Sequence, residues 1–574
     1  MVKRFLGKFS KPEKYVILGL IAVILISSVW HSILLNGSSQ LKPVKGGSII
    51  EGVVGKPQVI NPLYSQSNQI DADISKLVFS GLIKSDRGRE ILPDLAESWS
   101  VTNSGKTYIF NLRQDVVWHD GESFDADDVY FTIKLLQEDN YTGILKSGWQ
   151  GIVVTVLDKY TIQFDLPNAS TFFLSRAAVG ILPAHLFAHL PIVEIGLTEH
   201  NQQPIGTGPY KIVSSLSARD NINLMANKNY YGESPYLDKI VFYFYDTEKA
   251  LLQAIRNGGV TSAGFSVLSE SLDINLPTVN TYVYQLPQYK AVFFNQLGDN
   301  QILKDTAVRR ALALSTNKNK IVQDIMDGNA SVADSPILPG FWGHLPQMEK
   351  HDFDFVSARD VLDKAGWKDT DGDGTLDKDG QKLSFTLSFK DDVINNQIAQ
   401  SLISDWEAIG INVYIDPVPA ESLLDNVIRP RNYDALIFGQ SLGSDSDPYV
   451  YWHSSQTSDP GLALAIAYDK DIDGSLEMAR LTTNLNRAIG YYHEFQQAFA
   501  NSVPAILLYQ PNYVYLVDAK VKGVTDEINL SSATDRFTNI LEWFIKYNRV
   551  SEENIEVPTD ASAETKETVG DGGE

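Results

Sequence analysis

The stretch from Ile91 to Leu136 constrains the fold of this chain more than any other part of it. It reads ILPDLAESWSVTNSGKTYIFNLRQDVVWHDGESFDADDVYFTIKLL. Thr107 to Leu112 is a β-branched and aromatic run after an Asn-Ser-Gly turn, and Val116 to Trp118 is a second apolar run, so two strands are predicted. From Ser123 to Leu136 apolar residues recur with helical spacing, and aspartates crowd the first turn, where the helix dipole favours negative charge. The stretch predicts a strand pair that leads into a capped helix.

The order of residues in this stretch resembles the signature of the family 5 extracellular solute-binding proteins, the peptide- and nickel-binding subunits of ABC importers. The family pattern is roughly DLAxSWxxSxDGxTYTFxLRxxVxFHDGxxFTAxDVxxS. This chain differs by Trp118 at the aromatic position and by Ser123 and Asp125 at two threonine positions. The resemblance implies an α/β fold of the two-lobed periplasmic-binding-protein type (class II, cluster C), with mixed sheets flanked by helices.

Later segments continue the resemblance. Pro204 to Tyr210 contains a GTGPY-like turn, Tyr289 to Gln296 is similar to the strand by which relatives cross between lobes, and Tyr491 to Tyr509 is similar to the family's closing motif. The glycine-rich turn lacks the lysine and the following helix of a phosphate-binding loop. The expected division is a first lobe at 48–288, a second lobe at 289–508, a return to the first lobe at 509–548, and a disordered acidic tail at 549–574.

Charge and cysteine content exclude several classes of protein. A net charge of −23 argues against a nucleic-acid partner. The absence of cysteine excludes disulfides, thiol catalysis and Cys-based metal centres. It also excludes the acylated cysteine that anchors many members of the family that this chain resembles, so another anchor is expected.

The N-terminus supplies a candidate anchor. Residues 1–14 are basic, and residues 15–35 contain no Asp, Glu, Lys or Arg. At about 1.5 Å a residue, such a helix spans roughly 30 Å, which is the thickness of a bilayer core. We expect a cytoplasmic flank at 1–14, a transmembrane helix at 15–35, a linker at 36–47 and an extracellular or periplasmic main domain. A cleaved signal peptide is the alternative, although no A-x-A-like site follows.

The resemblance also implies where a solute binds. The candidates by position are Asn61, Tyr64, Trp149, Trp342, Gln440, Ser441, Asp445 and Trp452. In peptide-binding members, the loop that corresponds to residues 440–452 here carries an acidic residue that pairs with the α-ammonium of the ligand. That acidic residue stands four positions before a proline, which is Pro448 in this chain. That position is Ser444 here and the nearest carboxylate is Asp445, which puts a peptide ligand in question.

One stretch has the spacing of a calcium loop. Asp369, Asp371, Asp373 and Asp377 occupy ligand positions of such a loop, but its last position is Gly380 instead of glutamate. A polar turn without metal is the alternative. No cofactor and no catalytic residue is predicted, and HExxH does not occur in the sequence.

Together these features predict a monomeric, membrane-anchored receptor that captures a peptide-like solute between its lobes and delivers it to the permease and ATPase subunits of an importer. Three alternatives remain: a non-peptide solute such as an oligosaccharide or a metal chelate, a tethered sensor or scaffold, and an extracellular hydrolase. The hydrolase is the weakest, because no nucleophile–base pair is evident.

Overall fold

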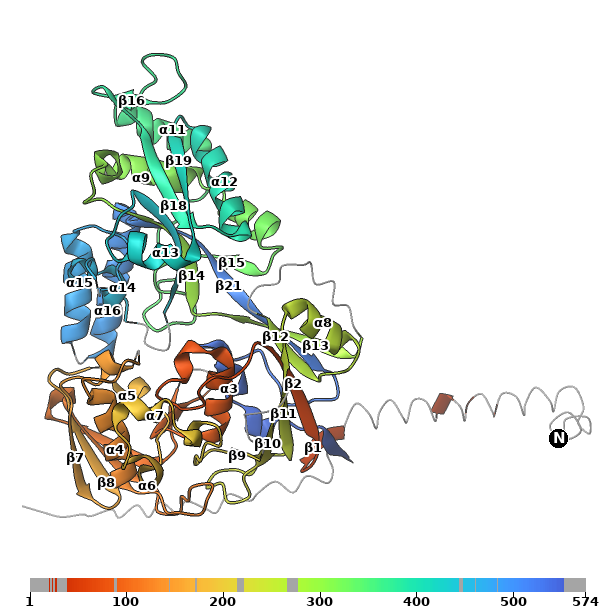
Figure 1. Cartoon of the computed structure of the whole chain (residues 1–574). Helices are drawn as coiled ribbons and strands as arrows, with labels where there is room; N and C mark the ends of the chain where they lie inside the picture. The colour runs from red at the N-terminus through yellow and green to blue at the C-terminus, as the bar shows by residue number, and fades with distance from the viewer. Residues whose placement is uncertain are drawn as a thin grey trace, which may run out of the picture. The chain divides into compact units, whose positions relative to one another are not determined.

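The computed structural model (Figure 1) describes residues 39–86, 90–143, 145–170, 173–213, 221–265, 277–442, 447–459, 461–482 and 484–551, together with Leu20, Val23, Ile26 and Ser27. The chain divides into two compact units. One comprises residues 1–47 and 544–574, and the other comprises residues 48–543.

The unit formed by the two chain ends contains a two-stranded antiparallel sheet. β1 (Ser39–Val44) pairs with β22 (Lys546–Ser551). The stretch expected to be a linker therefore contains a strand. Most of the predicted anchor at 15–35, and the predicted tail from residue 552 on, lie outside the described residues. Among the helices in the described part of the chain, none has the length and apolar character that crossing a membrane requires.

The larger unit is built on one mixed sheet. Its strands follow the order β19 (Asn412–Val418), β18 (Ser384–Lys390), β20 (Ala435–Ser441), β14 (Gln288–Phe294), β21 (Ala505–Asp518), β12 (Ser262–Phe265), β2 (Ser48–Val54), β11 (Lys239–Tyr245), β10 (Asn221–Ala226) and β9 (Tyr210–Ile212). Two further strands, β13 (Val279–Gln285) and β15 (Ala330–Val332), also pair with β21.

The long strand β21 connects two lobes. Its first half pairs with β14 and its second half with β12 and β13. We call the elements from β2 to β13, with the chain after β21, the first lobe, and those from β14 to α16 the second lobe. The chain passes between the lobes at Leu286-Pro287 and Gln510-Pro511. There the Leu286 N–H donates to the Pro511 carbonyl at 3.1 Å, and the Gln510 side-chain amide donates to the Leu286 carbonyl at 2.8 Å. The two crossing points therefore lie side by side.

The first lobe adds a four-stranded antiparallel sheet, a short hairpin and several helices. The sheet has the order β5 (Ala96–Thr102), β6 (Thr107–Leu112), β8 (Thr161–Asp165) and β7 (Val153–Asp158), and β3 (Ile83–Ser85) pairs with β4 (Ile91–Pro93). The helices are α3 (Gln69–Val78), α4 (Ala126–Gln137), α5 (Phe173–Arg176), α6 (Ala184–Phe187), α7 (Ile192–Ile195) and α8 (Glu248–Arg256).

The strand and the helix predicted on either side of Trp118 are confirmed in the signature stretch. Thr107–Leu112 is β6, and α4 begins with a capping box in which the side chains of Asp125 and Asp128 accept backbone N–H groups. The second predicted strand, at Val116–Trp118, is wrong. It is reduced to one isolated bridge between Val117 and Ser123, because the His-Asp-Gly turn reverses the chain directly after it.

The same stretch holds the glycine-rich turn in place. His119 Nε2 contacts the Gly208 carbonyl at 3.0 Å, and its Nδ1 accepts the Gly206 N–H at 3.3 Å. A neutral ring with its hydrogen on Nε2 satisfies both contacts. A Cβ at Gly206 would lie 1.9 Å from the Val78 carbonyl oxygen, so only glycine fits at the end of α3. Two motifs that are far apart in sequence therefore meet at the C-terminus of α3.

A buried ion cluster fixes α3 from the other side. The Arg536 guanidinium lies in the short 3-10 helix η10 (Ala533–Phe537) and contacts Glu51 of β2 at 2.9 Å and Asp73 of α3 at 2.5 Å. All three side chains are at most 1% exposed. The Tyr515 hydroxyl of β21 donates to Glu51 at 2.7 Å, and the Thr534 hydroxyl donates to Asp73 at 2.8 Å. The cluster joins a helix, the central sheet and the returning chain.

The second lobe packs helices on β18 to β21. They are α9 (Thr306–Ser315), α10 (Lys318–Lys320), α11 (Phe355–Lys364), α12 (Val393–Glu407), α13 (Ala420–Leu423), α14 (Tyr449–Trp452), α15 (Lys470–Leu481) and α16 (Leu485–Ser502). In Figure 1, α9, α11 and α12 lie near β18 and β19, whereas α15 and α16 lie side by side. This arrangement gives the lobe a core on each face of the sheet.

Two adjacent arginines on α9 have different environments. Their charge predicts a solvated or ion-paired helix face for both Arg309 and Arg310, yet Arg309 is only 2% exposed. Its guanidinium donates to the carbonyls of Ser502 and Val503, where α16 ends. It therefore acts as a C-terminal cap. Arg310 is exposed and pairs with Glu349 at 3.2 Å, as expected.

Candidate functional site

Two adjoining cavities lie between the lobes. The first cavity has a volume of about 770 Å³ and the second a volume of about 500 Å³. Each is lined by residues of both lobes. A volume of this size suits a solute larger than a single amino acid, because drug-sized ligands occupy pockets of about 300–1,000 Å³.

The first-lobe wall of the first cavity is built on α3 and on the loops around it. Asn68 caps α3 and its side chain accepts the N–H groups of Ile70 and Asp71, and three residues of the helix, Ala72, Ser75 and Lys76, line the cavity. The second-lobe wall is formed by the loop after β20 and by α14 and α15. The first-lobe lining includes Pro62, Ser65, Gln66, Ala72, Ser75, Lys76, Phe79, Trp149, Arg176, Thr534 and Asp535, and the second-lobe lining comprises Leu442, Asp447, Val450, Tyr451, Leu462 and Arg480.

Gly148, Arg176, Asp447 and Arg480 line both cavities, and we call these residues the junction. Gly148 and Arg176 belong to the first lobe, and Asp447 and Arg480 belong to the second. The Arg176 Nη1 donates to the Gly148 carbonyl at 3.2 Å. The junction is therefore a charged boundary between the two cavities, to which both lobes contribute.

The other charged groups of the first cavity are paired. Lys76 lies 3.7 Å from Asp535, and both belong to the first lobe. The cavity is otherwise lined by small polar and apolar side chains, which is the usual composition of a solute site.

The structure places one predicted ligand residue, Trp149, directly in the wall of the first cavity. Its ring packs against Phe164 and Phe173, with centroids 6.2 and 5.9 Å away, and only 2% of the residue is exposed. The backbone carbonyl of Trp149 accepts the Gln137 side-chain amide at 2.9 Å. The wall is therefore rigid at this point.

Asn61 and Tyr64 do not line either cavity, although their neighbours Pro62, Ser65 and Gln66 do. The buried Asn61 side chain donates to Asn201 at 3.0 Å and accepts the Leu63 N–H at 3.0 Å, so it holds the loop in shape. Tyr64 packs edge-on against Tyr141, and burial raises the pKa of its phenol. The loop therefore lines the first cavity with Pro62, Ser65 and Gln66 and not with the two predicted side chains.

The predicted ligand residues of the second lobe make their contacts within that lobe. The Gln440 side chain is buried and bonds to the Tyr289 hydroxyl and the Leu462 carbonyl. The Ser441 carbonyl accepts the Tyr451 hydroxyl at 2.9 Å. Trp342 packs on Tyr492, and Trp452 lies in the core between Tyr289, Phe293 and Phe499. None of these four predicted residues lines the two cavities. Asp445 lies outside the described residues.

Sequence reasoning missed the arginines of the junction. Arg480 lies 33 residues after its partner Asp447, on a helix whose position in the fold has no signature in the sequence. Asp447 stands before a proline, which is typical of a turn, and its carboxylate accepts the Tyr449 N–H at 3.1 Å. The carboxylate also holds Arg480, which spacing alone could not indicate.

In the aspartate loop of the second lobe, a lysine side chain pairs with the carboxylates that could bind a metal. Asp369, Asp371 and Asp373 are exposed and place carboxylate oxygens within 4.8 Å of one another. However, the Lys382 ammonium lies 2.6 Å from Asp371 and 2.9 Å from Asp373. Asp377 accepts the Thr370 N–H and hydroxyl. The loop is held by internal hydrogen bonds between β16 (Asp377–Lys378), β17 (Gln381–Lys382) and the turn before them.

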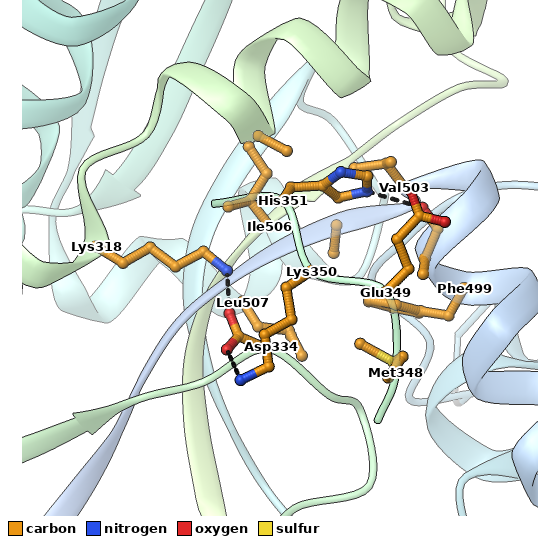
Figure 2. A pocket seen from close by; sticks show the side chains of 13 residues that line it. Lys318, Asp334, Met348, Glu349, Lys350, His351, Phe499, Val503, Ile506 and Leu507 are labelled. Carbon is orange, nitrogen blue, oxygen red and sulfur yellow. Dashed lines mark hydrogen bonds and ion pairs between the residues drawn. The ribbon is translucent and has the colours of Figure 1, made fainter. Parts of the chain in front are cut away.

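A third cavity, within the second lobe, is too small for a solute. Figure 2 shows Lys318 and Lys350 directed at Asp334, at 2.9 and 3.1 Å. His351 contacts the Ala500 carbonyl at 2.9 Å beside them. The volume is about 20 Å³, which is room for about one water molecule.

Comparison with known proteins agrees with this arrangement. Residues 90–461 match the model of the bacterial extracellular solute-binding proteins, family 5. The oligopeptide-binding protein AppA of Bacillus subtilis is 29% identical over 501 residues, which cover 84% of this chain and 89% of that protein. The nickel-binding periplasmic protein of Escherichia coli is 26% identical over 435 residues, which cover 72% of this chain and 80% of that protein.

Solved structures show the same fold. The structure of AppA from B. subtilis in complex with a nonapeptide has a TM-score of 0.69 at 27% identity, and the match covers 88% of this chain and all of that one. The structure of NikZ from Campylobacter jejuni in complex with Ni(L-His) has a TM-score of 0.70 at 28% identity, with 87% and 99% covered. The relatives described here are named as binding proteins and not as enzymes. The resemblance carried by residues 91–136 is therefore confirmed, and this chain belongs to the bacterial extracellular solute-binding proteins of family 5.

Proposed function

We propose that this chain is the substrate-binding protein of an ABC importer, which captures a peptide-like solute between its lobes and delivers it to the permease. The observation that carries this proposal is the pair of cavities lined by both lobes. A solute bound there contacts both walls at once, so it binds the closed arrangement of the lobes more tightly than an open one and shifts the protein towards closure. The similarity to a protein named oligopeptide-binding supports a peptide as the solute.

Closure on a solute requires two lobes that are joined by a hinge. We propose that residues 48–288 and 509–548 form one lobe and residues 289–508 the other. The paired crossing points at Leu286-Pro287 and Gln510-Pro511 would then be the hinge. A hinge of two adjacent strands permits rotation about one axis, which is what closure on a solute requires.

We also propose that residues 15–35 anchor a monomeric receptor in the membrane, with residues 1–14 in the cytoplasm and the lobes outside the cell. The support is the uncharged stretch after a basic flank and the absence of a cysteine that could be acylated. The family is described as extracellular, which agrees with this orientation.

A metal chelate is the second candidate solute. The specific observation in its favour is the similarity to NikZ in complex with Ni(L-His), at 28% identity over 87% of this chain. Both candidates use the same site and differ in what fills it.

Native mass spectrometry of the full chain in detergent tests the proposal. The protein is mixed with a pool of random tri- to nonapeptides, with a pool of oligosaccharides and with nickel–histidine. We expect peptide adducts in the wild type. Val450→Trp fills the first cavity and abolishes them, whereas Val356→Trp, at a position that is 79% exposed on α11, leaves them unchanged. Wild-type protein that retains no peptide would rule out the peptide function.

A further inference from the structure

The strand pair formed by the two chain ends is basic, although the chain as a whole is acidic. We call residues 39–47 and 546–551, which contain β1 and β22, the ribbon. The ribbon has no Asp or Glu, and its basic residues are Lys42, Lys45, Lys546 and Arg549. The whole chain has a net charge of −23. The ribbon is therefore a local excess of positive charge, which attracts anions.

Three of these cations lack a counter-ion. The side chains of Lys42, Lys45 and Lys546 are exposed. Neither a salt bridge nor a hydrogen bond joins any of their ammonium groups to another residue in the described part of the chain. Their charge is therefore available to a partner outside the chain.

Two of the lysines share one face of the ribbon. Lys42 pairs with Asn548 and Val44 pairs with Lys546. Lys42, Val44 and Lys546 therefore lie on the same face, since side chains alternate along a strand. The Lys546 side chain folds over Gly46, where an added Cβ would lie 2.6 Å from Nζ. Val44 is 36% exposed, so this face combines cations with an apolar group, as segments at a membrane interface do.

The proposed anchor brings the ribbon to the membrane. β1 begins at Ser39, four residues after Leu35, which is the last residue of the proposed anchor. A chain covers at most about 3.6 Å per residue, so Ser39 lies within about 14 Å of the hydrocarbon core. The headgroup layer occupies about 5–7 Å of this distance. The remainder is about one Debye length at physiological ionic strength, so charges on the headgroups act on the ribbon.

The acidic tail is the other anionic partner within reach. Residues 552–574 follow β22 directly and contain eight acidic residues and one lysine. Ser551 pairs with Ser39, at the opposite end of β22 from Lys546, so the tail must turn back along the strand to reach this lysine. The anchor holds the ribbon at the membrane without any such reversal. The lipid surface is therefore the favoured partner.

We propose that the ribbon lies along the membrane surface and binds the phosphate headgroups of anionic phospholipids through Lys42, Lys45 and Lys546. The inference rests on the proposed function, because it takes residues 15–35 to be a membrane anchor. Lys45 and Lys546 are at the end of the ribbon remote from Ser39, so all three lysines reach the headgroups only when the ribbon lies flat. Since β2 starts directly after the ribbon, this contact also keeps the main domain close to the membrane.

Quenching by labelled lipid tests this inference in the full chain. The chain has no native cysteine, so Asn548→Cys, at an exposed position of β22, carries a single fluorophore. The protein is placed in nanodiscs of phosphatidylcholine, with or without phosphatidylglycerol, that contain a lipid with a spin-labelled headgroup. We expect the spin label to quench the fluorophore more strongly when phosphatidylglycerol is present, and high salt should remove the difference because it screens the charges.

Substitution of the lysines then identifies the contact. Each lysine near an anionic surface contributes a factor of about five to binding, so Lys42→Gln with Lys45→Gln and Lys546→Gln should weaken the bound state of the ribbon about 100-fold. Arginine at the same three positions should retain the dependence on phosphatidylglycerol. The control removes three exposed lysines of the second lobe and should leave the dependence unchanged, by Lys364→Gln, Lys368→Gln and Lys390→Gln.

Flotation with vesicles separates this inference from the proposed anchor. Full chain that floats with phosphatidylcholine alone supports the anchor. Equal quenching with and without phosphatidylglycerol, or quenching that survives the three glutamine substitutions, would overturn lipid binding by the ribbon while the anchor stands. Flotation only with phosphatidylglycerol would support lipid binding and remove the anchor. If the dependence appeared only after truncation at Ser551, the acidic tail would be the partner of the ribbon and the lipid would not.

Discussion

Replacing Arg536 with methionine is expected to lower the free energy of unfolding by about 3–5 kcal/mol. The substitution leaves Glu51 and Asp73, which are both at most 1% exposed, without the cation between them. Two neighbouring carboxylates in the protein interior then repel each other and lack water. Urea unfolding of the full chain, followed by tryptophan fluorescence, measures the loss.

A surface arginine provides the control for this result. Arg429→Met removes an exposed pair with Asp425, which is worth less than about 1 kcal/mol. Adding Glu51→Gln and Asp73→Asn to Arg536→Met should recover much of the lost stability, because no buried charge remains. If Arg536→Met cost no more than Arg429→Met, the cluster would not hold α3 against the sheet.

Acidification is expected to remove about 3 kcal/mol of stability through His119. Burial lowers the pKa of this ring from its usual 6.5 to about 4, although the Gly208 carbonyl favours the charged form. The folded chain therefore prefers the neutral ring. The contribution is complete above pH 6.5 and is lost as the pH falls from 6.5 through 4, since the unfolded chain takes up the proton first. Protonation would also remove the acceptor that Nδ1 offers to the Gly206 N–H.

Comparison with a variant separates the contribution of His119 from that of the carboxyl groups, which also titrate as the pH falls. His119→Gln should be markedly less stable than the wild type at pH 7.5, and the difference in unfolding free energy should shrink towards pH 4. His189→Gln, at an exposed position of the same lobe, should match the wild type throughout. A wild-type to His119→Gln difference that stayed constant with pH would contradict the role given to the neutral ring.

Local pattern predicted two elements of the signature stretch. The strand β6 and the capped helix α4 follow from a β-branched and aromatic run, from helical spacing and from capping residues, all of which are continuous in the chain. The isolated bridge at Val117 was not predictable in this way, because an apolar run shows that a strand is possible and not that a partner strand lies beside it.

Contacts between residues that are far apart in the chain could not be predicted from the sequence. His119 and Gly206 are both in recognisable motifs, yet nothing in either motif shows that they bond to each other across 87 residues. Arg309 read as solvated or ion-paired because it is charged and adjoins a second arginine, and only the packing of α9 on the end of α16 makes it a cap.

The candidate site was predicted to within a loop but not to the side chain. Trp149 lines the first cavity, whereas Asn61 and Tyr64 shape a loop whose other residues line it. Which side chain of a loop faces a cleft depends on the turn geometry and on the opposite lobe. Arg480 escaped prediction for the same reason, since α15 reaches the junction only in the folded lobe.

The central claim is that the two lobes close on a solute, and the distance between the walls of the cleft tests it most directly. Asn168 and Leu481 line opposite walls of the second cavity, and the chain contains no native cysteine, so Asn168→Cys with Leu481→Cys places two spin labels selectively. Pulsed electron paramagnetic resonance gives the distribution of distances between the labels. We predict a shift to shorter distances when the full chain is saturated with a bound peptide. A distribution that stays the same while calorimetry shows binding would contradict closure on the solute.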